Sequence, residues 1–164
     1  MYRRINDFRL DWLASVNKAE QVIDAITDET MDQAIEEGHN TLGSLAWHLT
    51  QSAFGIGRML EVPVKPPAAE EQPKTADELL AHYHNTAESL ELGILQHLKD
   101  DMLEDQVHFA GEEMPKGQLL RMIVDHQTHH IGQMTVLLRQ AGLKVPGIMG
   151  PTKEDIEAKR AQSH

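Results

Sequence analysis

The sequence predicts an all-α fold, a four-helix bundle followed by a short C-terminal helical tail. Aromatic residues make up 4 % of the 164 residues and hydrophobic residues 40 %, so the core must be mainly aliphatic, which suits helices better than sheets. Apolar residues also recur at spacings of three and four along four long segments, as on the buried face of a helix. The chain has the length of one domain and no linker, which predicts a single domain over residues 1–164.

The first two segments each carry one apolar stripe. The first stripe comprises Phe8, Trp12, Val16, Ala19, Ile23 and Ile26. The second comprises Leu42, Leu45, Leu49, Ala53, Ile56 and Leu60. Asn40 is expected to cap the second helix, because its short side chain can accept a hydrogen bond from a free backbone amide. Prolines between residues 63 and 73 end this helix, because proline lacks the amide donor and clashes with the preceding turn.

The third segment opens on a capping box formed by Thr75 and Glu78. Its stripe comprises Leu80, Tyr83, Ala87, Leu90, Ile94 and Leu98. Residues 100–115 are expected to form a loop. The three main connections are similar in length, so they leave the order of the helices in the bundle open.

The fourth segment is expected to run from about Lys116 to Ala141, where Gly142 supplies a left-handed stop. Its stripe comprises Leu119, Ile123, His126, His130, Met134 and Leu137. Beyond a stretch punctuated by glycine and proline, a short charged segment from Thr152 forms the helical tail.

Composition excludes several classes of function. Lys and Arg total 15 against 26 Asp and Glu, a net charge of −11, and they form no cluster of the kind that neutralises phosphates. Nucleic-acid binding is therefore not expected. No apolar run approaches the roughly 18–20 residues of a membrane span, and the N-terminus lacks the apolar stretch of a secretory signal. With 0 Cys there is no disulfide framework, and we expect a cytoplasmic protein.

Three histidines occupy positions where a core should be apolar. His126 and His130 are four residues apart, so they lie one turn apart on the same face of a helix, and His48 lies between Leu45 and Leu49. Burying imidazoles without partners costs roughly a few kcal/mol each. A metal ion would explain all three, because imidazole is the usual ligand of zinc, nickel, iron and copper. Two ligands from one helix and one from another would leave coordination positions open to water or substrate.

Spacing alone leaves alternatives. A single interior histidine is more often a hydrogen-bonded core residue than a ligand. His129 lies about 60° from His126 around the helix, so it could replace either neighbour or line a pocket without ligating. Other histidines are more typical of loops or the surface, namely His39, His82, His108 and His164.

Several enzyme motifs can be excluded. The segment keeps both histidines of the HExxH motif but has Gln127 where the general-base glutamate belongs, so a zinc peptidase of that kind is not expected. There is also no GxSxG elbow and no glycine-rich phosphate loop.

Four glycines fall inside predicted helices, where they either leave room for a ligand or permit close helix packing. They are Gly43, Gly55, Gly57 and Gly132. Tyr83 on the third stripe either offers its hydroxyl to a substrate or packs in the core with that hydroxyl at the rim.

These segments resemble a known family. Asp125–Gln133 (DHQTHHIGQ), continuing to Gly142, is similar to the signature helix of the DinB/YfiT-like superfamily, and Asn40–Leu49 (NTLGSLAWHL) resembles its other ligand-bearing segment. The end Met149–Thr152 resembles the family's C-terminal end, so the likeness covers nearly the whole chain.

The resemblance implies a four-helix bundle, often dimeric, that holds a divalent metal, zinc or nickel, through His48, His126 and His130. It also implies that His129 is not a ligand. Relatives of this kind include S-transferases and isomerases that use low-molecular-weight thiols, and metal-dependent hydrolases.

We therefore expect a metal-dependent transferase or hydrolase in which the ion activates a thiol or water for attack on a small electrophile. Because the chain lacks Cys, a thiol nucleophile would be a separate low-molecular-weight cofactor. No general base stands out, and three residues are candidates to support the ligands: Glu91, Asp125 and Gln133. The alternative is a non-catalytic metal-binding or stress-response module. The expected partners are a small-molecule substrate and a second copy of the chain in a homodimer.

Overall fold

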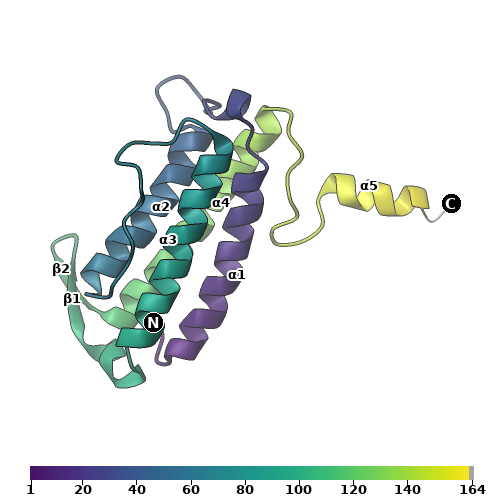
Figure 1. Ribbon diagram of the computed structural model, residues 1–164. Coiled ribbons are helices and arrows are strands. Elements are labelled where there is room, and N and C mark those ends of the chain that lie inside the picture. The colour runs from purple at the N-terminus through teal and green to yellow at the C-terminus, as the bar shows by residue number, and fades with distance from the viewer. Residues whose placement is uncertain (163–164) are drawn as a thin grey trace.

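Four long helices form the body of the protein in a computed structural model that describes residues 1–162 (Figure 1). They are α1 (Ile5–Asp24), α2 (Leu42–Met59), α3 (Ala76–His97) and α4 (Lys116–Gln140). Two short 3₁₀ helices, η1 (Asp28–Thr30) and η2 (Asp100–Glu104), lie in the connections, and α5 (Lys153–Gln162) follows the bundle. His164 lies outside the described residues. The predicted four-helix bundle with a helical tail is present.

The helices are not arranged in simple sequence order. Both α1 and α2 pack against α3 and α4, so consecutive helices α1 and α2 lie diagonally across the bundle. Figure 1 shows α1 and α4 running in one direction and α2 and α3 in the other. The parallel pair α2 and α3 requires a long crossover, residues 60–75, that returns along the length of the bundle. The helix order, which the similar lengths of the connections left open, is therefore set by a crossover between α2 and α3.

The crossover packs directly against α3. The backbone amide of Lys65 donates a hydrogen bond of 2.8 Å to Ser89 Oγ. One turn further along α3, a Cβ on Gly93 would collide with the carbonyl oxygen of Pro63. Gly93 is thus required by close approach of the backbone of the crossover.

The expected loop at residues 100–115 contains a β-hairpin, so the all-α prediction is incomplete there. Strand β1 (Gln106–Phe109) pairs antiparallel with β2 (Glu112–Pro115). Ala110 and Gly111 have φ of 52° and 89°, both positive as in the two-residue turns that match the twist of a hairpin. With only four residues in each strand, the alternation of apolar and polar residues is too short to identify in the sequence.

The ends of the helices follow from local chemistry, with one correction. Thr41, not Asn40, caps α2: its hydroxyl accepts from the Ser44 amide while Ser44 Oγ accepts from the Thr41 amide. Thr75 caps α3 by accepting from the Glu78 amide, and Gly142 ends α4 with φ of 75°. A threonine hydroxyl satisfies a free amide as well as the predicted asparagine would.

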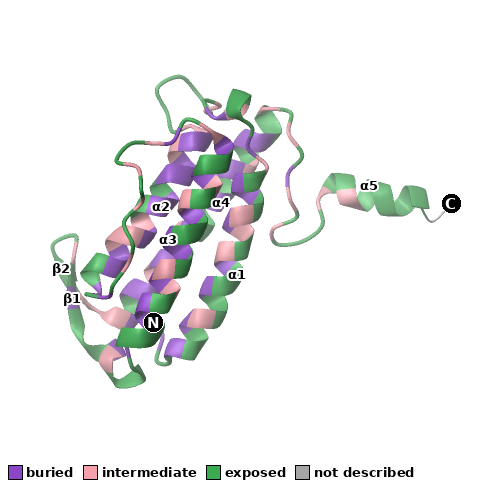
Figure 2. Ribbon diagram, in the orientation of Figure 1, coloured by how far each residue is buried: buried purple, intermediate pink, exposed green. Residues whose placement is uncertain are grey.

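The inner faces of the four helices form one aliphatic core (Figure 2). On α3 the buried stripe includes Leu79 in place of the predicted Leu80, which is half-buried. The tail helix α5 extends away from the bundle and has no buried residue among those described, and its contact with α4 includes an ion pair of 2.8 Å between Arg139 and Glu154. None of the described helices combines the length and apolarity needed to cross a lipid bilayer.

One polar network lies inside this core. Gln127 on α4 is 1 % exposed, accepts a hydrogen bond of 2.7 Å from the Tyr83 hydroxyl of α3, and donates one of 2.7 Å to Ser15 Oγ of α1. Burial raises the pKa of Tyr83 well above its usual range, so the phenol stays protonated and remains a donor. Tyr83 is therefore a core residue engaged with Gln127, and both sequence-based alternatives for its hydroxyl, at a substrate or at the rim, are wrong.

Replacing Gly93 tests the close approach of the crossover. We expect Gly93→Ala to lower the free energy of unfolding by about 1–2 kcal/mol, because the new methyl group overpacks against the Pro63 carbonyl. The matched control is Gly132→Ala on α4, where no atom lies within 4 Å of an added Cβ; it should stabilise by up to about 1 kcal/mol. Urea denaturation followed by circular dichroism measures both, and equal effects would contradict this packing.

Replacing Gln127 tests the buried network. Gln127→Leu should lower the free energy of unfolding by about 2–3 kcal/mol, because it leaves the buried Tyr83 hydroxyl and Ser15 without their partner. Gln140→Leu, at the exposed end of the same helix, should change it by less than about 0.5 kcal/mol. The two variants are compared by chemical denaturation, and similar values would show that the network contributes nothing.

Candidate metal centre

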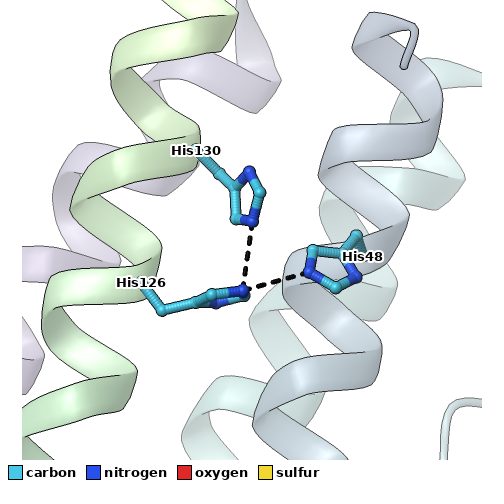
Figure 3. A group of neighbouring side chains, drawn as sticks. All are labelled: His48, His126 and His130. Carbon is cyan, nitrogen blue, oxygen red and sulfur yellow. Dashed lines mark hydrogen bonds between the residues drawn. The ribbon is translucent and has the colours of Figure 1, made fainter. Parts of the chain in front are cut away.

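Three histidine side chains from two helices converge at the rim of the bundle (Figure 3). Nε2 of His126 on α4 lies 3.1 Å from Nε2 of His48 on α2 and 3.1 Å from Nε2 of His130 on α4. One ring nitrogen from each of the three lies within 4.8 Å of the others. The sequence placed these residues on facing helices, and the structure brings them together.

The two short contacts among these rings cannot both be hydrogen bonds while the rings are neutral. Gln133 Oε1, which can only accept, lies 2.7 Å from His130 Nδ1, so Nδ1 carries the proton and His130 Nε2 presents its lone pair. His126 Nε2 then faces two neighbours but can direct a single N–H toward only one of them. At least one of the two close contacts is therefore not a proper hydrogen bond among neutral rings. A cation at the focus would instead accept a lone pair from every ring.

The spacing fits a metal ion. Ligand nitrogens bind a transition metal at 2.0–2.1 Å, and two of them at 90–109° lie about 2.8–3.4 Å apart. Two of the three separations, both 3.1 Å, fall within this range, and the third pair, His48 and His130, lies within 4.8 Å. The donor set of three imidazoles suits zinc, nickel, copper or iron rather than magnesium or calcium, which take oxygen ligands.

The surroundings of two of the rings, those of His126 and His48, favour the neutral form that can bind a cation. Partial burial, followed by the neighbouring imidazoles of His130, His48 and His129, lowers the pKa of His126 to about 4. Burial and then His130 also lower the pKa of His48. His126 Nδ1 is buried without a hydrogen-bond partner, so among the described residues the ring is oriented through Nε2 and by packing.

The centre is open to solvent, which corrects the expectation that these histidines point into the bundle interior. His48 is exposed, and His126 and His130 are half-buried. The buried face of α4 passes beside them and comprises Gly117, Leu119, Leu120, Ile123, Val124, Gln127, Ile131, Met134, Leu137 and Leu138, which include the four apolar residues of the predicted stripe. The histidines flank that buried face on the side that faces α2.

Other candidate residues from the sequence are placed differently. His129 is exposed and is not part of the cluster, although its ring packs edge-on against His130. Glu91 pairs with Arg9 at 2.8 Å, and Asp125 pairs with Arg121 at 2.7 Å, so both carboxylates are engaged elsewhere. Gln133 contacts a member of the cluster, since its Oε1 accepts from His130 Nδ1 and fixes that ring's tautomer.

Two pockets flank the histidines along the seam between α2 and α4. The pocket on the hairpin side has a volume of about 350 Å³ and is lined by both His48 and His126, with Phe109 of β1 at its wall. The pocket on the opposite side, of about 310 Å³, is lined by Gln133 and by His39 and Asn40 of the α1–α2 connection. The three-histidine cluster thus lies between two spaces large enough for a small molecule.

The four helix glycines divide into two groups. An added Cβ on Gly43 or Gly57 would collide with neighbouring side chains, so these two serve close packing. At Gly55 and Gly132 no atom lies within 4 Å of an added Cβ. Gly55 lines the hairpin-side pocket, whereas Gly132 lines neither of the two pockets beside the histidines.

Comparison with known proteins agrees with this architecture. The sequence pattern of the DinB family matches residues 1–162. The chain belongs to the DinB family. Within the family, the uncharacterized protein YrdA of Bacillus subtilis is 34 % identical over 156 residues, which cover 94 % of this chain and 93 % of YrdA.

Solved DinB structures share the fold. A DinB-like protein from Bacillus cereus is 32 % identical with a TM-score of 0.84, over 90 % of this chain and 99 % of that one. YfiT from Bacillus subtilis, described as a probable metal-dependent hydrolase with an unusual four-helix bundle topology, is 20 % identical with a TM-score of 0.66, over 84 % of this chain and 87 % of YfiT. At that identity the likeness to YfiT establishes the fold alone.

Proposed function

We propose that this protein is a metal-dependent enzyme in which His48, His126 and His130 hold one divalent cation, zinc or nickel. Its reaction is attack by water, or by a low-molecular-weight thiol, on a small electrophile. The observation that carries the proposal is the meeting of three Nε2 atoms whose contacts cannot all be hydrogen bonds. The description of YfiT as a probable metal-dependent hydrolase supports hydrolysis as the first reaction to test.

Catalysis is favoured over a purely structural metal site because the ligand set is open. Among the described residues, the cluster has three potential ligands, one from α2 and two from α4, and no carboxylate or fourth histidine joins it. A structural zinc site typically closes its coordination with four protein ligands. His48 and His126 also line the hairpin-side pocket, where a substrate can reach them.

The chain's own groups define how the reaction would proceed. A bound divalent cation lowers the pKa of a water or thiol and so supplies a nucleophile near neutral pH. The described lining of the hairpin-side pocket contains no carboxylate to act as general base, so deprotonation depends on that lowered pKa. Ser52 Oγ lies 3.5 Å from His48 Nε2 and can hydrogen-bond a polar substrate atom beside the centre. Gln133 keeps the His130 lone pair directed at the centre.

Metal content tests the ligand set. Protein purified without a histidine tag should contain about one divalent metal per chain by elemental analysis. His48→Ala, His126→Ala and His130→Ala should each lose it, because two imidazoles bind far more weakly than three. His129→Ala is the matched control and should retain the metal.

Equal loss in all four variants would contradict the assignment, and a metal-free wild-type protein after reconstitution would overturn the proposal.

The metal-loaded protein is then assayed with p-nitrophenyl acetate, and with 1-chloro-2,4-dinitrobenzene plus a small thiol. Turnover absent from His126→Ala supports an enzyme, and its dependence on thiol separates transfer from hydrolysis. Absence of turnover with both would leave a metal-binding module.

Replacing Gln133 tests whether it orients His130 for metal binding. Gln133→Leu should weaken metal binding by about 10–100-fold, as expected for loss of a group that orients a ligand. Gln140→Leu, exposed at the end of the same helix, should leave the affinity unchanged. Competition with a chromophoric chelator measures both affinities, and an unchanged value for Gln133→Leu would mean that packing alone orients His130.

A further inference from the structure

The hairpin-side pocket differs in chemistry from the rest of the seam between α2 and α4. We infer that it selects substrates that carry a compact, uncharged apolar group beside their reactive centre, and that Gly55 sets the size of that group. This inference rests on the proposed function, since the group is placed relative to the metal-facing nitrogens of His48 and His126, which line the same pocket.

The wall of the pocket is apolar and uncharged. Beyond the two histidines it is formed largely by Ile56, Met59, Phe109, Met122 and Ile123. None of the described residues that line it is Asp, Glu, Lys or Arg. A charged substrate group placed there would lose its hydration without gaining a partner, whereas an apolar group would gain by leaving water.

Gly55 lines this space and faces it without a side chain. It lies seven residues beyond His48 on α2, two turns along nearly the same face, so its missing side chain would project beside the histidines. Glycine inside a helix is less favourable than alanine, so a structural reason for it is expected. Close packing explains the glycine at Gly57, where an added Cβ would collide with Val64 and press on Leu90. It does not explain Gly55, where an added Cβ would meet no atom within 4 Å.

The remaining walls can adjust to the shape of the apolar group. Met59 and Met122 have flexible, polarisable side chains that adapt to different ligands. Phe109 is the last residue of β1, next to the turn of a hairpin with four residues in each strand. The backbone of α2 at Gly55 cannot adjust in this way, which makes position 55 the fixed limit on size.

The opposite pocket has a mixed lining. Ile35, Leu45, Val136 and Leu137 are apolar, whereas His39, Asn40 and Gln133 offer hydrogen bonds. Polar groups of a substrate that bridges the centre can find partners on that side, which favours the hairpin-side pocket for the apolar group.

Alkyl hydroxamates test the inference on the metal-loaded protein, because the hydroxamate group chelates the metal and the alkyl tail probes the pocket. In the wild type, hexanohydroxamate should bind about 10–100-fold more tightly than acetohydroxamate by isothermal titration calorimetry, since each CH₂ removed from water adds up to about fourfold. In 6-aminohexanohydroxamate the same tail ends in a charged amine, and this advantage should disappear. Gly55→Leu should reduce the ratio between hexano- and acetohydroxamate to below about threefold.

Gly132→Leu is the matched control, because Gly132 is also a helical glycine with open space around an added Cβ but lies outside this pocket. It should keep the wild-type ratio. An unchanged ratio in Gly55→Leu, or equally tight binding of the charged tail, would overturn the inference. Metal content, measured in each sample, shows whether the variants are folded and loaded.

A second probe separates this inference from the proposed function. If the wild type held no metal and bound no hydroxamate, the proposed function would fail while the pocket remained testable. The neutral dye N-phenyl-1-naphthylamine is therefore titrated into metal-depleted protein, where Gly55→Leu should weaken binding at least about tenfold and Gly132→Leu should not. Equal dye binding by all three proteins would overturn the inference independently of the metal.

Discussion

The rotation of α4 about its own axis determines where His126 and His130 point. Gln127 fixes that rotation, because its buried amide is bound to Tyr83 of α3 on one side and to Ser15 of α1 on the other. Turning the helix would leave the buried polar groups of Gln127, Tyr83 and Ser15 unpaired. The free-energy cost of an unpaired buried group exceeds the net stabilisation that a typical hydrogen bond provides. With Gln127 directed toward α1 and α3, His126 and His130 are left facing α2, where His48 meets them.

The histidines themselves contribute little to holding the bundle together. His48 is exposed and His126 and His130 are only half-buried, so they are not part of the aliphatic core that stabilises the fold. Their mutual contacts are imperfect as hydrogen bonds, and burial lowers the pKa of His126 to about 4, so protonation does not resolve them near neutral pH. The fold therefore assembles a binding site from rings that gain little from one another. Such an arrangement is consistent with a site built for a ligand rather than for stability.

The sequence predicted the helices well because each carries a clear stripe and its own end signals, such as Thr75 before α3 and Gly142 after α4. On α4 it predicted the buried Leu119, Ile123, Met134 and Leu137 correctly, but it placed His126 and His130 with them and missed the buried Gln127, because a polar residue interrupts the apolar pattern. The hydrogen bonds of Gln127 to Tyr83 and Ser15 join residues far apart in the sequence, which periodicity cannot reveal. The hairpin was missed because its strands are short, and the helix order because loops of similar length permit several topologies.

The helix order explains why the site is accessible. The long crossover lies against α3 and meets α2 at Gly57, so it covers the seam between α2 and α3. The other two connections stay at the ends of the bundle, and no connection runs along the seam between the antiparallel helices α2 and α4 (Figure 1). The hairpin closes one end of that seam with Phe109, and the α1–α2 connection closes the other with His39 and Asn40. Because the crossover that joins the parallel helices α2 and α3 lies elsewhere, the seam between α2 and α4 stays open, and the three histidines lie between its two pockets.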